Sequence, residues 1–174
     1  YKTDRFLIDA CVEEARHDKP FSAVRLLADI AASFQPYAER LGVTLISDTQ
    51  GEPLLSCDHE SLERVLCNLI SNAIQNTPTG GTVHVAVVSE NERAVFLVSD
   101  TGCGIDPKRV RDFLAGERAA GLGLSIISRL TKEIGGTIDC QSETGIGTSI
   151  AVRVPQESFS FDAQGAPKNA AASV

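Results

Sequence analysis

Apolar residues recur every three or four positions in three long stretches of the chain, and this spacing predicts three amphipathic helices. The first covers residues 21–41, where Pro36 is expected to kink the helix or to divide it in two. The second covers residues 58–76 and begins at Asp58, a residue type that favours the N-cap position. The third follows a glycine pair and ends at Gly135.

Short runs rich in β-branched residues lie between the helices and predict strands. One strand covers residues 43–46 and a second, shorter one lies around residues 53–56. Four more strands form two predicted hairpins, 82–89 with 93–99 and 137–142 with 148–154.

Three further segments have weaker patterns. Residues 1–19 are helix-like, with one apolar stripe that nothing local covers, so they are expected to pack on another chain or a neighbouring domain. Residues 106–120 carry mixed charge without clear periodicity, which is typical either of a mobile lid or of a solvated loop with one helical turn. Residues 156–174 are rich in small and polar residues, and we expect a disordered tail.

Composition narrows the class of protein. The 174 residues, 43 % hydrophobic and 22 % charged, fit one globular domain with little to spare. A net charge of −7 argues against nucleic acid as a partner, and the absence of a long apolar run argues against direct membrane contact. Five scattered cysteines form no C-x-x-C pair, which favours a reducing cytoplasm. The chain begins at Tyr1 and contains no methionine, so we expect a fragment of a longer protein.

A carboxylate followed by two glycines ends the strand at residues 93–99. Ionised Asp100 can only accept hydrogen bonds, so it would favour adenine, which presents an amine, over guanine, which presents a carbonyl. Gly102 and Gly104 lack Cβ atoms and would let a flat ligand approach the backbone. The alternative interpretation is an ordinary turn.

A polar stripe accompanies the apolar stripe of the second predicted helix. Asn68, Asn72 and Gln75 lie within about 60° of one another on a helical projection. Asparagine is a poor helix former, so its repetition in mid-helix needs a reason. The amides either bridge neighbouring loops or present oxygen ligands to a Mg²⁺ ion that arrives with phosphates.

A second glycine pair, Gly121 and Gly123, opens the third helix. Free N–H groups and the positive end of the helix dipole would make this a site for an anion. Close packing of helices also selects such glycines, and both interpretations stay open.

In this order and spacing, the motifs resemble the ATP-binding catalytic domain of sensor histidine kinases, in the GHKL or Bergerat-fold superfamily. The matching motifs are the N box, two glycine boxes and a terminal hairpin, at Asn68–Ala73, Asp100–Ile105, Gly121–Ile126 and residues 135–148. The resemblance covers residues 21–155 and implies an α/β fold. This fold is a two-layer sandwich, with a mixed, mostly antiparallel sheet covered by three helices.

The resemblance also implies roles for single residues. Asn72 would bind Mg²⁺, Asn68 would lie on the phosphate and metal side, and these two are the catalytic candidates. Thr148 would reach the adenine pocket through water. The complete implied ATP-binding set is Asn68, Asn72, Gln75, Asn76, Asp100, Gly102, Gly104, Ile105, Arg118, Gly121, Leu122, Gly123, Leu124 and Thr148.

The implied activity is transfer of the ATP γ-phosphoryl group to a histidine on a dimerisation domain. Asparagine at position 68, where related ATPases have a glutamate, fits transfer better than hydrolysis. Residues 20–155 would form the catalytic domain, and residues 1–19 the end of a dimerisation and phosphotransfer hairpin. The implied partners are that domain, within a homodimer, and a response regulator. The expected location is cytoplasmic, with membrane attachment of the parent protein left open.

Some positions depart from the family pattern. Gln75 and Asn76 stand where many members have a lysine and a tyrosine, and Arg118 is the candidate for the missing positive charge. The lid is short, with Phe113 as the remnant of an aromatic pair. His17 lies too close to Pro20 to match the phospho-acceptor motif. The alternatives are therefore an ATP-binding regulator or pseudokinase without phosphotransfer, and a serine kinase of the anti-sigma type.

Overall fold

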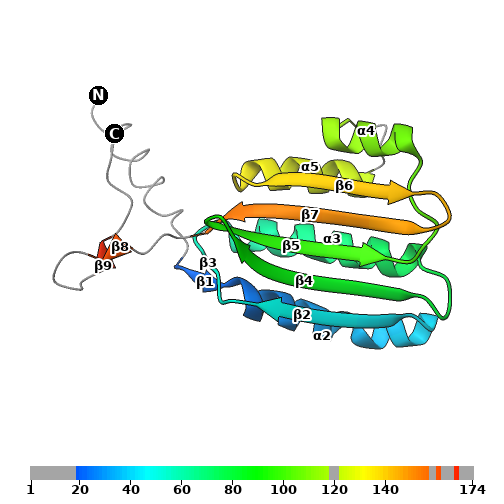
Figure 1. Ribbon diagram of the computed structural model, residues 1–174, viewed down its shortest axis with the longest axis horizontal. Helices are drawn as coiled ribbons and strands as arrows, with labels where there is room; N and C mark the ends of the chain where they lie inside the picture. The colour runs from blue at the N-terminus through cyan, green and yellow to red at the C-terminus, as the bar shows by residue number, and fades with distance from the viewer. Residues whose placement is uncertain (1–18, 118–121, 157–159, 162–166, 169–174) are drawn as a thin grey trace, which may run out of the picture.

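A mixed five-stranded sheet forms the centre of the structure, a computed structural model that describes residues 19–117, 122–156, 160–161 and 167–168. The strand order is β2-β4-β5-β7-β6 (Figure 1). β2 runs parallel to β4, and the remaining neighbours are antiparallel. The strands are β2 (Thr44–Gln50), β4 (Thr82–Glu90), β5 (Arg93–Asp100), β6 (Thr137–Glu143) and β7 (Gly147–Pro155). The predicted strands and both predicted hairpins are confirmed.

Three helices cover one face of this sheet, so the predicted two-layer α/β sandwich is confirmed (Figure 1). They are α2 (Ala23–Leu41), α3 (His59–Asn76) and α5 (Leu122–Glu133). The core between the layers combines the apolar stripe of α3 with the inward-facing residues of β4, β5 and β7. Within the described part of the chain, no helix combines the length and apolarity needed to cross a bilayer.

A fourth helix, α4 (Pro107–Ala115), lies beyond β6 at the edge of the sheet, so the prediction of a loop with one helical turn is wrong for these residues (Figure 1). The alternative of a mobile lid stays a prediction. The Asp106 side chain accepts a hydrogen bond from the Lys108 N–H at 2.8 Å, and Pro107 occupies the first turn. Gly116 ends the helix with a φ of 77°. Fully buried Phe113 anchors α4. End signals, rather than apolar periodicity, define this helix.

α2 continues through Pro36 without a break, so the prediction that Pro36 divides the helix in two is wrong, while the alternative of a kink stays a prediction. A proline inside a helix removes one backbone hydrogen bond and leaves the carbonyl four residues earlier without its partner. Here Pro36 and Ala32 are both exposed, so water can satisfy the Ala32 carbonyl. Residues 21–22 belong to a short strand instead of the helix.

Two pairs of short strands complete the description. β1 (Phe21–Ser22) pairs with β3 (Leu54–Leu55), which confirms the strand predicted around residues 53–56. β8 (Ser160–Phe161) pairs with β9 (Pro167–Lys168). Residues 1–18 and most of the segment after residue 156 lie outside the described residues, so the helical segment and the disordered tail stay predictions.

Candidate active site

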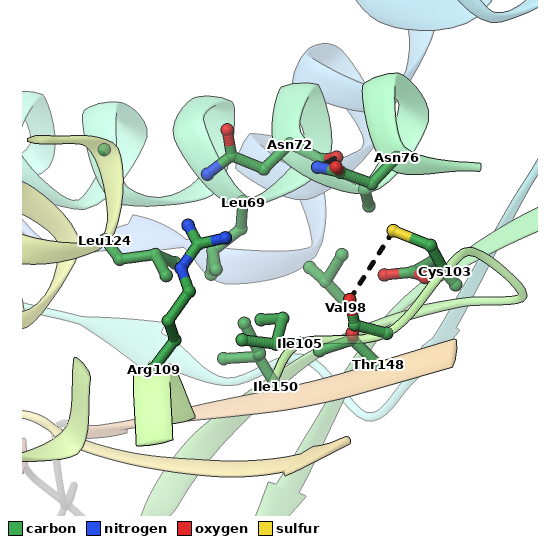
Figure 2. A pocket seen from close by; sticks show the side chains of 14 residues that line it. Leu69, Asn72, Asn76, Val98, Cys103, Ile105, Arg109, Leu124, Thr148 and Ile150 are labelled. Atoms are coloured by element: carbon green, nitrogen blue, oxygen red, sulfur yellow. Dashed lines mark hydrogen bonds between the residues drawn. The ribbon is translucent and has the colours of Figure 1, made fainter. Parts of the chain in front are cut away.

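One cavity of about 330 Å³ lies between α3, the ends of β5 and β7, and the first turns of α4 and α5 (Figure 2). Its volume is at the small end of the range for ligand pockets. The described lining residues are Leu69, Asn72, Ala73, Asn76, Val98, Asp100, Cys103, Gly104, Ile105, Arg109, Gly123, Leu124, Thr148 and Ile150. Residues from all the proposed motifs therefore meet around a single space.

Asp100 lies at the end of β5, opposite Thr148 of β7. Its Oδ1 atom accepts a hydrogen bond from the Gly102 N–H at 2.9 Å, and the Thr148 backbone N–H also donates to this carboxyl group. Burial raises the pKa of Asp100, while these two donors oppose the rise. The result is a half-buried acceptor held in a fixed orientation.

Thr148 is connected to the first glycine box through Ser142. The Ser142 Oγ accepts a hydrogen bond from the Ile105 N–H at 2.7 Å and donates to the Gly147 carbonyl at 3.0 Å. Its single proton is then used, so in the 2.9 Å contact with Ser142 the Thr148 hydroxyl is the donor. The Thr148 oxygen keeps lone pairs that can accept a hydrogen bond from water.

The two glycines after Asp100 are required by the protein's own backbone. A Cβ atom on Gly102 would collide with the carbonyl oxygen of Asn76, which accepts the Cys103 N–H at 3.2 Å. Gly104 has a φ of 73°, and its Cβ would collide with the Glu143 carbonyl. Gly104 lines the cavity, whereas Gly102 lines an adjoining hollow. The glycine turn is thus clamped between the end of α3 and the hairpin formed by β6 and β7.

The amide side chains of α3 do not all face the cavity. Asn72 and Asn76 line the cavity, and the Asn76 amide donates to the Asn72 carbonyl at 2.7 Å. Asn68 is half-buried, donates to the Arg64 carbonyl at 2.7 Å, and is not among the described residues that line the cavity. Gln75 lines the adjoining hollow and donates to the Ser71 hydroxyl at 3.2 Å.

The first turn of α5 lies against Asn72. A Cβ atom on Gly123 would be 3.4 Å from the Asn72 Nδ2 atom, so the amide and the helix backbone are in close contact. Leu124, largely buried, closes the cavity beside it. For Leu122 only the backbone is described, and Arg118 and Gly121 lie outside the described residues. The first N–H groups of a helix generally lack a partner within the helix, and such groups favour an anion.

Replacing Gly123 with alanine is expected to stabilise the domain and to weaken anion binding at the same time. Alanine is favoured over glycine inside a helix by about 1 kcal/mol, and no backbone atom obstructs its Cβ. The added methyl group would fill space between α5 and Asn72. Thermal unfolding should show a higher midpoint while titration with an adenine nucleotide shows lower affinity. A lower midpoint would contradict the described packing.

Sequence reasoning missed six of the lining residues. Leu69, Ala73, Val98 and Ile150 continue apolar stripes that look like ordinary core, and only the fold shows that they border a cavity. Cys103 lies between the two glycines of the first glycine box, and the sequence pattern that predicts a binding site there consists of the glycines alone. Arg109 is one of several charged residues in the expected loop, and nothing in the sequence distinguishes it from the others.

Comparisons with known proteins identify the family of this chain. Residues 57–158 match the family described as "Histidine kinase-, DNA gyrase B-, and HSP90-like ATPase". An uncharacterised sensor-like histidine kinase of Rhizobium meliloti is 31 % identical over 161 residues, which cover 84 % of this chain and 31 % of that protein. The chain spans less than a third of the length of the curated relatives that it matches.

Solved structures share the fold. The nucleotide-free catalytic domain of histidine kinase ThkA has a TM-score of 0.71 and 21 % identity, and the match covers 79 % of this chain and 95 % of that one. Full-length ShkA in complex with AMPPNP has a TM-score of 0.68 and 28 % identity, with 79 % of this chain and 31 % of that one covered.

Proposed function

The chain belongs to the histidine kinase-, DNA gyrase B- and HSP90-like ATPase family, and on that premise we propose that it binds ATP with Mg²⁺ and supplies the γ-phosphoryl group to a histidine. The observation that carries the proposal is the cavity itself. It has a fixed carboxylate, Asp100, at the end of β5, and the Asn72 amide beside the first turn of α5. These features suit the two ends of a nucleotide.

Asp100 would accept a hydrogen bond from the exocyclic amine of adenine. The apolar side chains of Val98, Ile105 and Ile150 line the same cavity, and they would contact the faces and edges of the base. Thr148 would accept a hydrogen bond from a bridging water. Burial removes water from the Asp100 carboxylate, and a hydrogen bond from the adenine amine would compensate for part of this lost hydration.

Asn72 would hold Mg²⁺ on the phosphate side. An amide oxygen is a hard neutral ligand, and Mg²⁺ is usually held by one or two protein oxygens together with substrate phosphates and water. The Asn72 amide is half-buried, lines the cavity and lies against the first turn of α5, so its placement fits such an ion. The ion would neutralise negative charge on the phosphates.

Phosphoryl transfer depends mainly on positioning and charge neutralisation. A neutral imidazole is already a nucleophile, so transfer to histidine needs little help from a general base. Asn68 is consistent with this, because an amide cannot remove a proton from water as a carboxylate could. Its amide bonds to the Arg64 carbonyl, so any role towards the phosphates would need this side chain to reorient.

The acceptor histidine would lie on a dimerisation and phosphotransfer domain of the parent protein, in a homodimer. A response regulator would then receive the phosphoryl group. Similarity to sensor histidine kinases, in which the matched region is less than a third of the length, supports this arrangement, and a cytoplasmic setting is part of the proposal.

A second candidate is an ATP-binding regulator that does not transfer phosphate. Gln75 and Asn76 favour it, because neutral amides stand where many family members have a lysine and a tyrosine. Their amide N–H groups already bond within α3, to Ser71 and Asn72.

The test uses the parent protein, incubated with ATP labelled in the γ-phosphate. We expect labelled protein whose phosphate is stable to alkali and labile to acid, as phosphohistidine is. Asn72→Ala should lower the transfer rate about 100-fold and remove the Mg²⁺ dependence of nucleotide affinity. Gln35→Ala, which alters an exposed amide on α2, should leave both unchanged.

Two results would contradict the proposal. Bound nucleotide without any labelled histidine would favour the regulator. Unchanged transfer in Asn72→Ala would remove this residue from the proposed metal site.

A further inference from the structure

Arg109 extends into the same cavity from α4. It lies in the first turn of that helix, three residues after the N-cap Asp106, and lines the cavity together with Asn72 and Gly123. Figure 2 shows its guanidinium group pointing from α4 towards α3, below Asn72 and beside Leu124. Its position therefore faces the part of the cavity that the proposed function assigns to phosphates.

The charges of the cavity are separated. Among the described residues that line it, Asp100 is the only acidic residue and Arg109 the only basic one. Asp100 lies where β5 ends, next to the first glycine box. Arg109 and Gly123 instead belong to the first turns of α4 and α5, which line the cavity as well. An anionic acceptor at one end and a cation at the other suit a ligand with a hydrogen-bond donor at one end and negative charge at the other.

The position of Arg109 on its helix favours an anionic partner. The first turn of α4 contains Lys108 and Arg109 and no acidic residue. Cations are disfavoured at the positive end of the helix dipole, and the N-cap carboxylate of Asp106 offsets the charge of only one of these two cations. A bound polyanion would offset this repulsion. The first turn of α5 adds further positive potential on the same side of the cavity.

The residues that α3 contributes to the described cavity lining include no cation. Gln75 lies in the adjoining hollow, bonded to Ser71, and Asn76 is neutral. Arg118, for which the sequence suggested this role, lies outside the described residues, whereas Arg109 is placed in the cavity itself.

We propose that Arg109 is the cation that binds the polyphosphate of the nucleotide, so that α4 rather than α3 supplies the positive charge. This inference rests on the proposed function and names a specificity-determining residue for it. A guanidinium group presents paired N–H donors that match two phosphate oxygens. Arg109 therefore distinguishes adenine nucleotides from adenosine, and phosphate binding fixes α4 over the cavity.

The test compares three ligands in calorimetric titrations at one Mg²⁺ concentration and one ionic strength: AMPPNP, ADP and adenosine. We expect Arg109→Met to weaken AMPPNP binding about 10- to 100-fold and to leave adenosine affinity within about twofold of wild type. Arg109→Lys should recover part of the loss, because it restores charge without the paired donors. Arg111→Met, which removes an exposed arginine of the same helix outside the cavity lining, is the matched control.

Thermal unfolding separates folding from binding in each variant. The inference is overturned if Arg109→Met loses no more AMPPNP affinity than Arg111→Met. It is also overturned if adenosine and AMPPNP affinities fall equally, since Arg109 would then support the cavity without contacting phosphate. A wild-type protein that binds none of the three ligands would contradict the proposed function itself.

Discussion

Replacing Asp100 with asparagine is expected to weaken binding of adenine nucleotides by about 100-fold or more. The carboxyl group accepts hydrogen bonds from the Gly102 and Thr148 N–H groups. In the variant one oxygen becomes an NH₂ group, which cannot accept a bond from the adenine amine and places donor against donor. The fold should survive, because burial already raises the pKa of Asp100 and so disfavours its ionised form.

Equilibrium titration of both proteins with AMPPNP and a matched guanine nucleotide measures this effect. The wild-type protein should bind AMPPNP more tightly than the guanine nucleotide, and the ratio of the two affinities should be smaller in Asp100→Asn. Asp139→Asn is the control, since it changes an aspartate of β6 that is 67 % exposed and paired with Arg153. Adenine nucleotide affinity within about threefold of wild type in Asp100→Asn would remove this residue from the adenine site.

Replacing Gly104 with alanine is expected to lower the free energy of unfolding by about 2–5 kcal/mol. Two effects add. The residue has a φ of 73°, a conformation that side chains other than glycine rarely adopt, and its Cβ would collide with the Glu143 carbonyl. The Cβ atom is fixed to the backbone of the glycine turn and the Glu143 carbonyl is itself backbone, so no side chain can rotate to remove the collision. The glycine turn would have to move away from the β6–β7 hairpin.

Gly80→Ala separates the two effects. Gly80 has a φ of 87°, but no atom lies within 4 Å of its Cβ position. The control should therefore lose only the conformational part, about 1–2 kcal/mol. Urea-induced unfolding of both variants gives the comparison. If both variants lost the same free energy of unfolding, the collision with the Glu143 carbonyl would make no contribution to the destabilisation of Gly104→Ala.

Elements with strong apolar periodicity were predictable from the sequence. The stripe of α3 and the β-branched runs of β4 and β5 face a shared core, so pattern and packing agree. α4 was not predictable in this way, because it buries one large side chain, Phe113, and is defined by Asp106, Pro107 and Gly116 at its ends. The expected division of α2 at Pro36 was wrong, because the cost of a proline inside a helix depends on whether water reaches the unpaired carbonyl, and periodicity alone does not give this exposure.

The candidate site was predictable where a motif requires an unusual residue type. Asp100 after a strand and glycine at the start of a helix are such signals, and both line the cavity. The asparagine stripe was a weaker guide, since residues that share a helical face can still meet different surroundings, as Asn68 and Asn72 do. Arg109 shares the cavity through tertiary packing of α4, and no spacing in the sequence connects it to Asn72.

Calorimetric titration of the wild-type chain with AMPPNP, with and without Mg²⁺, tests nucleotide binding, the central claim, most directly. We predict saturable binding of one nucleotide per chain that becomes tighter when Mg²⁺ is present. The absence of binding at ligand concentrations up to about 1 mM, far above those expected for a specific nucleotide site, would contradict the account. The chain would then be a member of the family that retains the fold without its ligand.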